Sequence, residues 1–529
     1  MYLVTSREAR LLDKTAIEEF GLPGIVLMEN AARSIAAAAF DFWPHWPVNP
    51  TAAILGGPGQ NGGDGWALAR IFSSAGFRVQ CCLVKGAGKE IGGDAAVNFN
   101  TAQKLGLPFA MIESDDAADS LGLERFDLIV DALFGTGLDR PLAGTAAALL
   151  KAAAAARTLA GPRSRVLAVD LPSGLSGDTG DLWGPPLAAD LTVTLGAPKV
   201  GLYLKEGPSL AGRIVVGDIG LTPEMFARAT PMGRLSEKAE LAPYLPCRPI
   251  NGHKGSFGHV MLAGGARGKT GALCLAALGA LRSGAALATA LHPASLGSVI
   301  ETKLTEVMSL ELPEAEPGEL AAAAGELILR YAAGRQSLAV GPGLGLGEGA
   351  LRAVLSIVEK ASLPLVLDAD ALTHLAGRLE DLKKCPAPAI LTPHPGEAGR
   401  LLSVGTKEIQ DDRLGAARAI SSRSGCVTVL KGHNTIISAP DGRFFLNAAG
   451  GPHLAVGGSG DLLTGLIAGL LAQKMAPFPA AALAVWIHSR AADMCRDERG
   501  PFGLTPTEFS HFVPRAFREL ADWREQKCQ

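Results

Sequence analysis

A glycine-rich turn before an apolar run is the feature of this sequence most suited to group-transfer chemistry. In AVGGSGDLLTG, residues 455–465, the turn Gly457–Gly460 precedes Asp461, and the run 461–473 predicts a helix. The free amides at such a helix N-terminus stabilise negative charge on a transferring phosphoryl group. Asp461, in the first helical turn, can accept the proton of an attacking hydroxyl. The alternative is that Asp461 only caps the helix.

A second glycine-rich turn lies near the beginning of the chain. GGPGQNGGDG, residues 56–65, follows a predicted strand and precedes a predicted helix, so its backbone can approach a phosphate closely. The turn is not the Walker motif, because no Lys-Ser or Lys-Thr pair follows it, and it lacks the spacing GxGxxG. The alternative is a plain tight turn that binds nothing.

Two aspartates follow apolar runs in the same half of the chain. Asp131 lies in DLIVDALFGTGLDRP and Asp170 in VLAVDLPSG, and glycine follows each of them. A carboxylate at the end of a strand, facing a phosphate-binding turn, can act as a base, an acid or a cation ligand. Each aspartate could instead cap a helix or order a turn.

The apolar runs that position these motifs predict two α/β domains with parallel sheets. Short apolar runs separated by helical patterns are typical of strands joined by crossover helices, and such sheets bind ligands at the carboxyl ends of their strands. The predicted helices are 65–76, 461–473 and a long buried helix over 271–291. The predicted strands are 51–57, 78–84, 127–133, 165–172 and 191–196, then those within 259–265, 337–345, 363–372, 388–397 and 427–432.

The composition sets limits on the class of protein. The 529 residues include 49 Lys and Arg and 52 Asp and Glu, a formal charge of −3, which does not favour a nucleic-acid partner. The eight cysteines form no CxxC pair and no metal-binding spacing, so reduced thiols in a cytoplasm are expected. The N-terminus lacks the apolar core of a signal peptide, and no uncharged apolar run reaches the roughly 20 residues of a membrane helix. We expect small-molecule substrates, no nucleic acid, no membrane and a homo-oligomer.

A connection separates the two glycine-rich turns. The segment 221–249 is rich in charge and proline and has no strong hydrophobic period. We therefore place a linker at 226–240, between a first domain of residues 1–225 and a second domain of residues 241–529.

Four segments of the first domain, taken in order, resemble the NAD(P)H-hydrate epimerase family. They are MENAA (28–32), GGPGQNGGDG (56–65), DALFGTGL (131–138) and DLPSG (170–174). The resemblance implies a Rossmann-like three-layer α/β domain, with Asp170 as the catalytic acid or base and K⁺ held by Asn61, Asp131 and Ser173. The implied contacts of the damaged dinucleotide are Gln60, Asn61, Gly62, Gly63, Asp64, Gly135, Thr136, Gly137, Leu138, Asp139, Arg140, Pro141 and Asp170. The family usually has two asparagines where this chain has Gln60 and Asn61.

The second domain resembles the ribokinase-like superfamily, and within it the ADP- or ATP-dependent NAD(P)H-hydrate dehydratases. The turn at Asp461 is joined by GHKGSFGHVMLAGG (252–265), KTGA (269–272), GPGLG (341–345), LDADAL (367–372), LTPHPGE (391–397) and LKGHNT (430–435). The resemblance implies a ribokinase-like α/β domain in which Asp461 acts on the reacting hydroxyl. The implied hydrate-binding residues are Ala272, Gly343, Gly345, His394 and Asp461, and the implied nucleotide-binding residues are Lys431, Gly432, His433, Asn434, Thr435 and Gly460.

Several of these residues also have structural interpretations. His394, between two prolines, could simply shape a turn, and Lys431 could be solvated surface. Asp368 and Asp370 in LDADAL either cap a helix or help to position magnesium or the site, and the sequence leaves the two open.

The two resemblances together imply the repair of hydrated NADH and NADPH. The first domain would interconvert the R and S epimers at C6. The second would phosphorylate the S hydroxyl with a nucleotide and Mg²⁺, then lose phosphate to regenerate NAD(P)H, with AMP as the other product when ADP, the expected donor, is used instead of ATP. The alternative is a ribokinase-like vitamin or sugar kinase with a non-catalytic N-terminal binding domain, because a fold does not fix a function. A dehydrogenase is less favoured, because no hydride-transfer constellation is visible.

Overall fold

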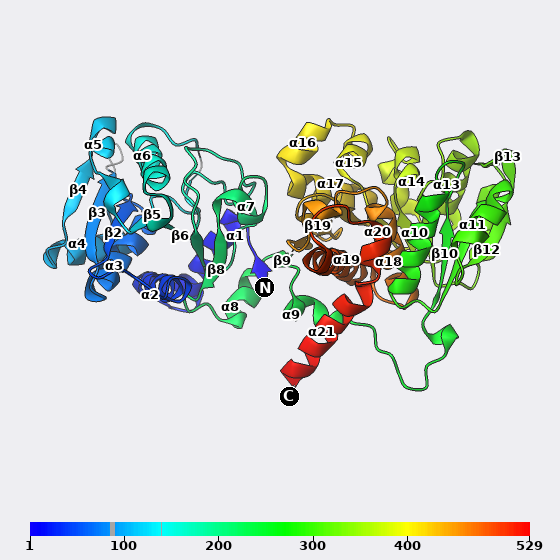
Figure 1. Ribbon diagram of the computed structural model, residues 1–529, viewed down its shortest axis with the longest axis horizontal. Helices are drawn as coiled ribbons and strands as arrows, with labels where there is room; N and C mark the ends of the chain where they lie inside the picture. Colours follow the sequence, from blue (N-terminus) through cyan, green and yellow to red (C-terminus); the bar gives the residue numbers. More distant parts are fainter. Residues whose placement is uncertain (85–89, 139, 529) are drawn as a thin grey trace. The chain divides into compact units, whose positions relative to one another are not determined.

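The computed structural model describes residues 1–84, 90–138 and 140–528, and the chain divides into two compact units (Figure 1). The first unit comprises residues 2–232, and the second comprises Met1 and the residues from Gly233 onward. The division lies inside the segment 226–240. Three short elements lie in or next to that segment: α8 (Pro223–Ala229), β9 (Gly233–Leu235) and α9 (Lys238–Leu241).

The first unit contains a sheet in which all paired strands are parallel. The strand order is β4-β3-β2-β5-β6-β7-β8, so the order of the strands reverses between β2 and β5. The strands are β2 (Thr51–Gly56), β3 (Arg78–Val84), β4 (Phe109–Ile112), β5 (Leu128–Ala132), β6 (Arg165–Val169), β7 (Leu191–Leu195) and β8 (Arg213–Gly217).

Helices cover both faces of this sheet. Ile54 and Val130 pack with α2, α3 and α4 in one hydrophobic cluster, whereas their neighbours Leu55 and Ile129 pack with α5 and α6 in another. Successive strand residues point to opposite faces, so this is the Rossmann-like three-layer fold that the sequence predicts. The remaining elements are β1 (Tyr2–Leu3), α1 (Ser6–Lys14), α2 (Gly24–Phe42), α3 (Gln60–Ser74), α4 (Gly93–Lys104), α5 (Asp115–Asp119), α6 (Gly144–Ala160) and α7 (Gly207–Leu210).

The sheet of the second unit runs β9-β20-β19-β18-β17-β16-β15-β10-β11-β12. Its pairs are parallel except for β18 with β19 and β19 with β20, which are antiparallel. A separate hairpin joins β13 (Glu314–Glu316) to β14 (Glu319–Leu320). The strands are β10 (His259–Ala263), β11 (Leu287–Pro293), β12 (Met308–Leu312), β15 (Ser337–Val340), β16 (Leu365–Leu367), β17 (Ala389–Leu391), β18 (Val427–Leu430), β19 (Thr435–Ser438) and β20 (Phe444–Asn447).

Apolar helices bury this second sheet. Strand residues such as Val260, Val366 and Ile390 share one large hydrophobic cluster with α10, α18 and α19, while α17 packs on β18 and β19 without joining that cluster. The helices are α10 (Thr270–Arg282), α11 (Gly297–Lys303), α12 (Ala324–Ala332), α13 (Glu348–Lys360), α14 (Asp370–His374), α15 (Pro395–Leu402), α16 (Thr406–Asp411), α17 (Arg413–Ser424), α18 (Ser459–Ala472), α19 (Pro477–Arg499), α20 (Pro506–Ser510) and α21 (Val513–Cys528).

The prediction of one long helix over 271–291 is wrong. The helix α10 ends at Arg282, Gly284 turns the chain with φ +99°, and β11 begins at Leu287. The small apolar residues of β11 are buried in a strand that has a parallel neighbour on each side, where they show no alternation. A short apolar run of this kind cannot be assigned to helix or strand by periodicity alone.

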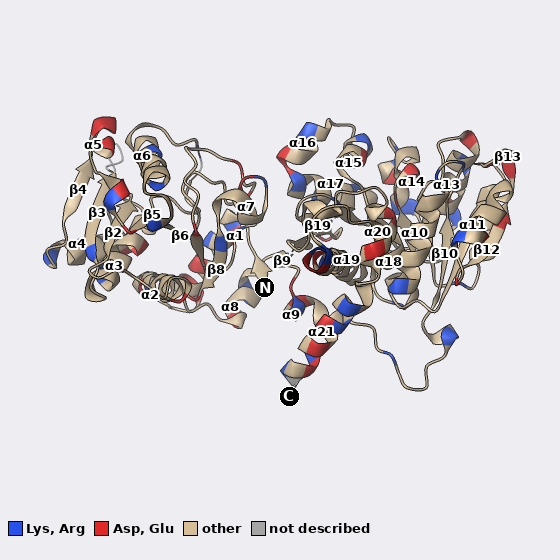
Figure 2. Ribbon diagram, viewed as in Figure 1, with Lys and Arg blue, Asp and Glu red and all other residues tan. Residues whose placement is uncertain are grey.

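The motifs singled out from the sequence follow strands at the carboxyl edges of both sheets. Asp170 directly follows β6, and Asp368 and Lys431 directly follow β16 and β18. Lys and Arg are interspersed with Asp and Glu over the surface, for example along α21 (Figure 2). Among the described residues, no helix is both long and apolar enough to cross a membrane.

Candidate active sites

The first candidate site lies where the order of strands reverses, at the carboxyl ends of β2 and β5. Open parallel sheets bind their ligands at such a crevice. The helix α3 begins at Gln60 and not at Gly65, so the glycine-rich segment forms the first turns of the helix itself. A Cβ atom on Gly62 would collide with the carbonyl oxygen of Gly57, and one on Gly63 would lie 2.9 Å from Ala95. Glycine is needed here because the helix N-terminus folds back closely on the strand end.

A buried carboxylate and a hydroxyl form the polar centre of this site. The Ser173 hydroxyl donates to Asp131 Oδ1 at 2.5 Å, and the Ser173 amide donates to Asp131 Oδ2 at 2.7 Å. Burial raises the pKa of Asp131 to about 6, although the hydrogen bonds from Ser173 lower it. Two of the three residues predicted to hold a cation are therefore in direct contact.

Asn61, Gly135 and Asp170 also meet in this crevice. A Cβ atom on Gly135 would lie 3.0 Å from Asn61 Oδ1 and 3.1 Å from Asp170 Oδ2. The Asn61 amide nitrogen is buried and has no hydrogen-bond partner among the described residues. The structure thus brings the predicted site residues from the ends of β2, β5 and β6 to one place.

Lys199 completes this site, and sequence reasoning missed it. Its ammonium donates to Asp170 Oδ1 at 2.5 Å and to the Leu195 carbonyl at 2.9 Å, and both charged side chains are buried. Asp170 adopts the left-handed conformation with φ +66°. The signal available in the sequence was a lone lysine in the apolar stretch GAPKVGLYL that follows the strand β7.

The remaining residues predicted to contact the dinucleotide lie around this centre. Asp64 is buried, and burial together with the negative charge of Asp170 raises its pKa well above the ordinary value. Gln60 is exposed at the start of α3. The loop after β5 carries Thr136, Gly137, Leu138, Arg140 and Pro141, while Asp139 lies outside the described residues.

The second candidate site surrounds the N-terminus of α18. Asp461 lies in its first turn, and the Lys431 ammonium lies 3.2 Å from where a Cβ atom on Gly460 would be. Burial and the charge of Asp368 raise the pKa of Asp461 to about 7, although Lys431 lowers it. A carboxylate, an ammonium and a set of free helix amides therefore converge, which suits the transfer of a phosphoryl group.

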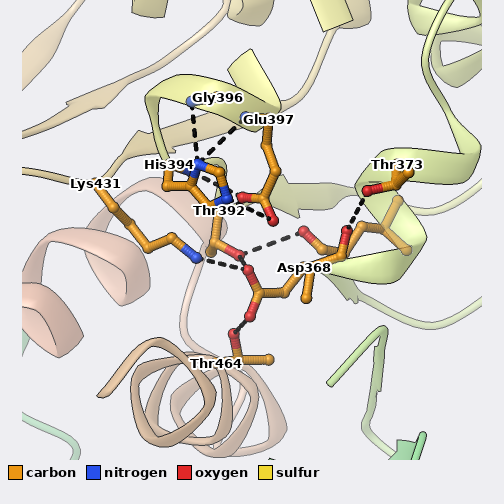
Figure 3. A network of polar contacts seen from close by, with 10 residues as sticks. Asp368, Thr373, Thr392, His394, Gly396, Glu397, Lys431 and Thr464 are labelled. Atoms are coloured by element: carbon orange, nitrogen blue, oxygen red, sulfur yellow. Dashed lines mark hydrogen bonds and ion pairs between the residues drawn. The ribbon is translucent and has the colours of Figure 1, made fainter. Parts of the chain in front are cut away.

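A network of polar contacts centred on Asp368 lies next to this site (Figure 3). Asp368 Oδ1 accepts hydrogen bonds from Lys431 Nζ at 2.8 Å and from the Thr392 hydroxyl at 2.7 Å. Its other oxygen accepts from the Thr464 hydroxyl of α18 at 2.8 Å. Sequence reasoning left the role of Asp368 open, and the structure places it in the interior, in contact with three elements.

The predicted hydrate-binding residues lie in two groups. A Cβ atom on Gly343 would lie 3.3 Å from Ala272, and the Gly345 amide donates to Asp370 at 2.9 Å. His394 is the N-cap of α15, where its Nδ1 accepts a hydrogen bond from the Gly396 amide at 3.0 Å and its side chain is half exposed. The structural interpretation of His394, that it shapes a turn, thus applies.

The predicted nucleotide-binding residues after Lys431 form the loop between the antiparallel strands β18 and β19. Gly432 and His433 are exposed there, and Gly432 and Asn434 have φ angles of +140° and +54°. The Thr435 hydroxyl donates to the Gly432 carbonyl at 3.2 Å, which closes the loop. The exposed part of this loop directly follows Lys431 in the chain.

Fold and sites together define a two-site α/β enzyme, with a Rossmann-like unit followed by a ribokinase-like unit. A family model described as YjeF-related protein N-terminus matches residues 24–201, and one described as NAD(P)H-hydrate dehydratase matches residues 260–515. The bifunctional NAD(P)H-hydrate repair enzyme of Moorella thermoacetica is 38% identical over 524 residues, 99% of this chain and 98% of the relative. The relative of that description from Escherichia coli is 32% identical over 506 residues, 95% of this chain and 91% of the relative.

The chain belongs to the family of bifunctional NAD(P)H-hydrate repair enzymes, and both predicted resemblances are confirmed. Among solved structures, the ADP/ATP-dependent NAD(P)H-hydrate dehydratase of Bacillus subtilis, co-crystallised with ATP and Mg²⁺, is 33% identical. It covers 54% of this chain and 98% of its own, with a TM-score of 0.46. The relationship over nearly the whole chain favours the repair function over the alternative of a vitamin or sugar kinase.

Proposed function

We propose that the first unit epimerises the C6 hydrates of NADH and NADPH with Asp170 as the acid and base, and that the second unit dehydrates the S epimer with Asp461 as the base. The observation that carries the proposal is the position of Asp461 and Lys431 at the N-terminus of α18, matched in the first unit by Asp170 at the edge of the crevice. We assign the epimerase to residues 1–225 and the dehydratase to residues 241–529.

Epimerisation needs only one proton carrier. The lone pair of the ring nitrogen expels the C6 hydroxyl when the protonated form of Asp170 donates a proton to it, which leaves a planar iminium, one water and the Asp170 carboxylate. Water then attacks either face of C6, and Asp170 removes the proton that the new hydroxyl must lose. Lys199 compensates the charge of the carboxylate through their direct contact. The loop Gly135–Pro141 and the segment Gln60–Asp64 would hold the dinucleotide against this centre.

The oxygen atoms of Asn61, Asp131 and Ser173 suit a K⁺ ion. They comprise an amide, a carboxylate and a hydroxyl, and oxygen donors are those that hard cations prefer. Bound there, K⁺ would supply positive charge that orders the site around the phosphates. The test is epimer exchange measured in K⁺, Na⁺ and a bulky organic cation. Equal rates in all three would contradict the assignment.

Dehydration proceeds by phosphorylation followed by elimination. Asp461 accepts the proton of the C6 hydroxyl while the hydroxyl oxygen attacks the terminal phosphorus of the nucleotide. The bond between that phosphorus and its bridging oxygen breaks. Lys431 and the amides at the start of α18 stabilise the negative charge on the transferring group. The ring nitrogen then expels phosphate from C6, and loss of a proton from C5 restores NAD(P)H. With ADP as the donor the nucleotide product is AMP, and Mg²⁺ would neutralise the phosphates of the donor.

Lys431–Thr435 and Gly460 would hold the nucleotide, while Ala272, Gly343, Gly345 and His394 would line the hydrate site. Such a shaped pocket places only one C6 hydroxyl against Asp461, so the other epimer would accumulate without the first unit. The two activities on one chain therefore allow the whole pool of hydrate to be repaired.

The experiment that tests both activities is the recovery of near-ultraviolet absorbance from a mixed-epimer NADH hydrate with ADP, ATP or no nucleotide. We expect nucleotide-dependent recovery of nearly the whole pool. Rapid recovery of only part of the pool would mean a dehydratase without an active epimerase. Recovery that is equally fast without nucleotide would contradict the phosphorylation step.

A further inference from the structure

One buried carboxylate joins the two elements that carry the phosphoryl-transfer groups of the second unit. Asp368 follows β16 and is only 1% exposed. Its side chain accepts hydrogen bonds from Lys431, at the end of β18, and from Thr464, one turn beyond Asp461 on α18 (Figure 3). A third hydrogen bond comes from Thr392, just after β17. Both carboxylate oxygens are thus occupied by partners from different elements.

The backbone next to Asp368 is held in a rarely populated conformation. Ala369 has φ +49° and ψ −118°, a conformation that side chains other than that of glycine rarely adopt. Gly341 of the neighbouring loop has no room for a Cβ atom, because the Asp368 carbonyl oxygen occupies that space. The surrounding structure therefore fixes where the strand ends and where its carboxylate points.

We propose that Asp368 is a positioning residue that sets the distance between the Lys431 ammonium and the Asp461 carboxylate during phosphoryl transfer. This inference rests on the proposed function, in which Lys431 and Asp461 act on the phosphoryl group and the hydroxyl. Asp368 holds Lys431 on one side and the helix that bears Asp461 on the other. It also competes with Asp461 for the ammonium, so that Asp461 stays available for the hydroxyl of the substrate.

The alternative role for Asp368 is purely structural, as one more buried group that ties α18 to the sheet. Ser337 provides a matched comparison, because its hydroxyl donates to the Ala468 carbonyl of α18 at 2.8 Å and is equally buried. That hydrogen bond lies at the amino ends of the strands, because Ser337 begins β15, whereas Asp368 lies at their carboxyl ends. Loss of either contact loosens the same helix, but only Asp368 contacts Lys431.

The test compares D368N, K431M, the double variant and S337A in the full-length protein. The measurements are kcat, KM for the S hydrate, KM for the nucleotide, and thermal unfolding. We expect D368N to lower kcat about 100-fold, as small displacements of reacting groups do, with KM for the S hydrate unchanged. The double variant should be no slower than K431M, because the two residues act through one contact. S337A should lower the unfolding temperature and leave kcat and both KM values unchanged.

Two results would overturn the inference. One is wild-type kcat in D368N after correction for the folded fraction, and the other is a double variant whose loss is the product of the two single losses. If K431M itself retains wild-type turnover, the role of Lys431 in the proposed function is wrong and the inference falls with it. If K431M is impaired and D368N is not, only the inference is overturned.

A second variant, T464V, tests the same inference if D368N does not fold. T464V removes the hydrogen bond from α18 but keeps the contact between Asp368 and Lys431. We expect it to lower kcat several-fold while the binding of ADP with Mg²⁺, measured by calorimetry, stays unchanged. Wild-type kcat in T464V would overturn the inference.

Discussion

The Lys199 ammonium lies 2.5 Å from Oδ1 of Asp170, and the two residues form a buried ion pair at the carboxyl edge of the first sheet. Asp170 holds this position in the left-handed backbone region, with φ +66°. Non-glycine residues persist in such conformations only when the surrounding structure fixes them, and they cluster at functional sites. The pair therefore combines a strained backbone, a buried charge and a compensating cation.

Replacement of Asp170 by asparagine should abolish epimer exchange without unfolding the protein. Asparagine has the same shape and tolerates the left-handed region, but it cannot carry the proton. We expect the rate of exchange between the R and S hydrates, followed by chromatography from a single epimer, to fall by about 10²–10⁴-fold. The control is D461N, which should retain epimer exchange. Exchange at the full rate in D170N would contradict the assignment of Asp170.

Removal of the Lys199 ammonium should destabilise the folded protein. In K199M the Asp170 carboxylate stays buried without its partner, which typically costs about 3–5 kcal/mol of unfolding free energy. The double variant D170N/K199M has no such charge and should recover part of that loss. Denaturant unfolding of the three variants measures this difference. A double variant that is less stable than K199M would show that the pair does not act as a buried ion pair.

The sequence predicted the fold class because strands and the helices between them leave local patterns, and it singled out motifs that the structure places at the carboxyl edges of the two sheets. The runs at 78–84 and 165–172 begin where β3 and β6 begin. The grouping of Asn61, Asp131 and Ser173 came from the resemblance to the epimerase family, and the structure places Asp131 and Ser173 in contact. These motifs are informative because the apolar run of a strand and the glycine or aspartate that follows it lie within a few residues of each other in the chain.

What the sequence could not predict depends on contacts between distant segments. Lys199 and Asp170 are 29 residues apart, and Lys431 and Asp368 are 63 residues apart, so no local pattern pairs them. The antiparallel strands β19 and β20 were missed because each has only four residues and these are almost all buried, so neither shows the alternation that marks a strand. The helix–strand boundary near Gly284 failed for a related reason, since uniform burial removes the periodicity on which the prediction depends.

A methyl group on Gly135 should impair the first site specifically. Its Cβ atom would lie 3.0 Å from Asn61 Oδ1 and 3.1 Å from Asp170 Oδ2, so one or both side chains must move. We expect G135A to slow epimer exchange at least about tenfold, because a displaced catalytic group is a poor proton carrier. The control is G92A, where the N-cap of α4 has open space around the added methyl group. Equal rates in G135A and the wild type would mean that this loop moves away from the site when substrate binds.

The pH dependence of the dehydratase should report the ionisation of Asp461. Burial and the neighbouring carboxylate of Asp368 raise the pKa of Asp461 from 3.8 to about 7, and only the ionised form can accept the proton of the hydroxyl. The nucleotide-dependent rate with the S hydrate should therefore fall about tenfold for each pH unit below 7 and level off above it. A rate that stays constant from pH 5 to pH 8 would contradict the role of Asp461 as the base.

The stability of the folded protein should also depend on the ionisation of Asp461, but it should decrease as the pH rises, whereas the rate increases. Because the folded-state pKa of Asp461 lies above the unfolded value of 3.8, its contribution to stability is fully present below pH 4 and is lost as the pH rises through 7. D461N removes the ionisable group, so the variant should unfold at a higher temperature than the wild type at pH 8. The difference should shrink at pH 4, where the wild-type carboxyl is largely neutral in both states. Thermal unfolding of the two proteins without nucleotide measures it, and a difference that is the same at both pH values would show that another property of the substitution causes it.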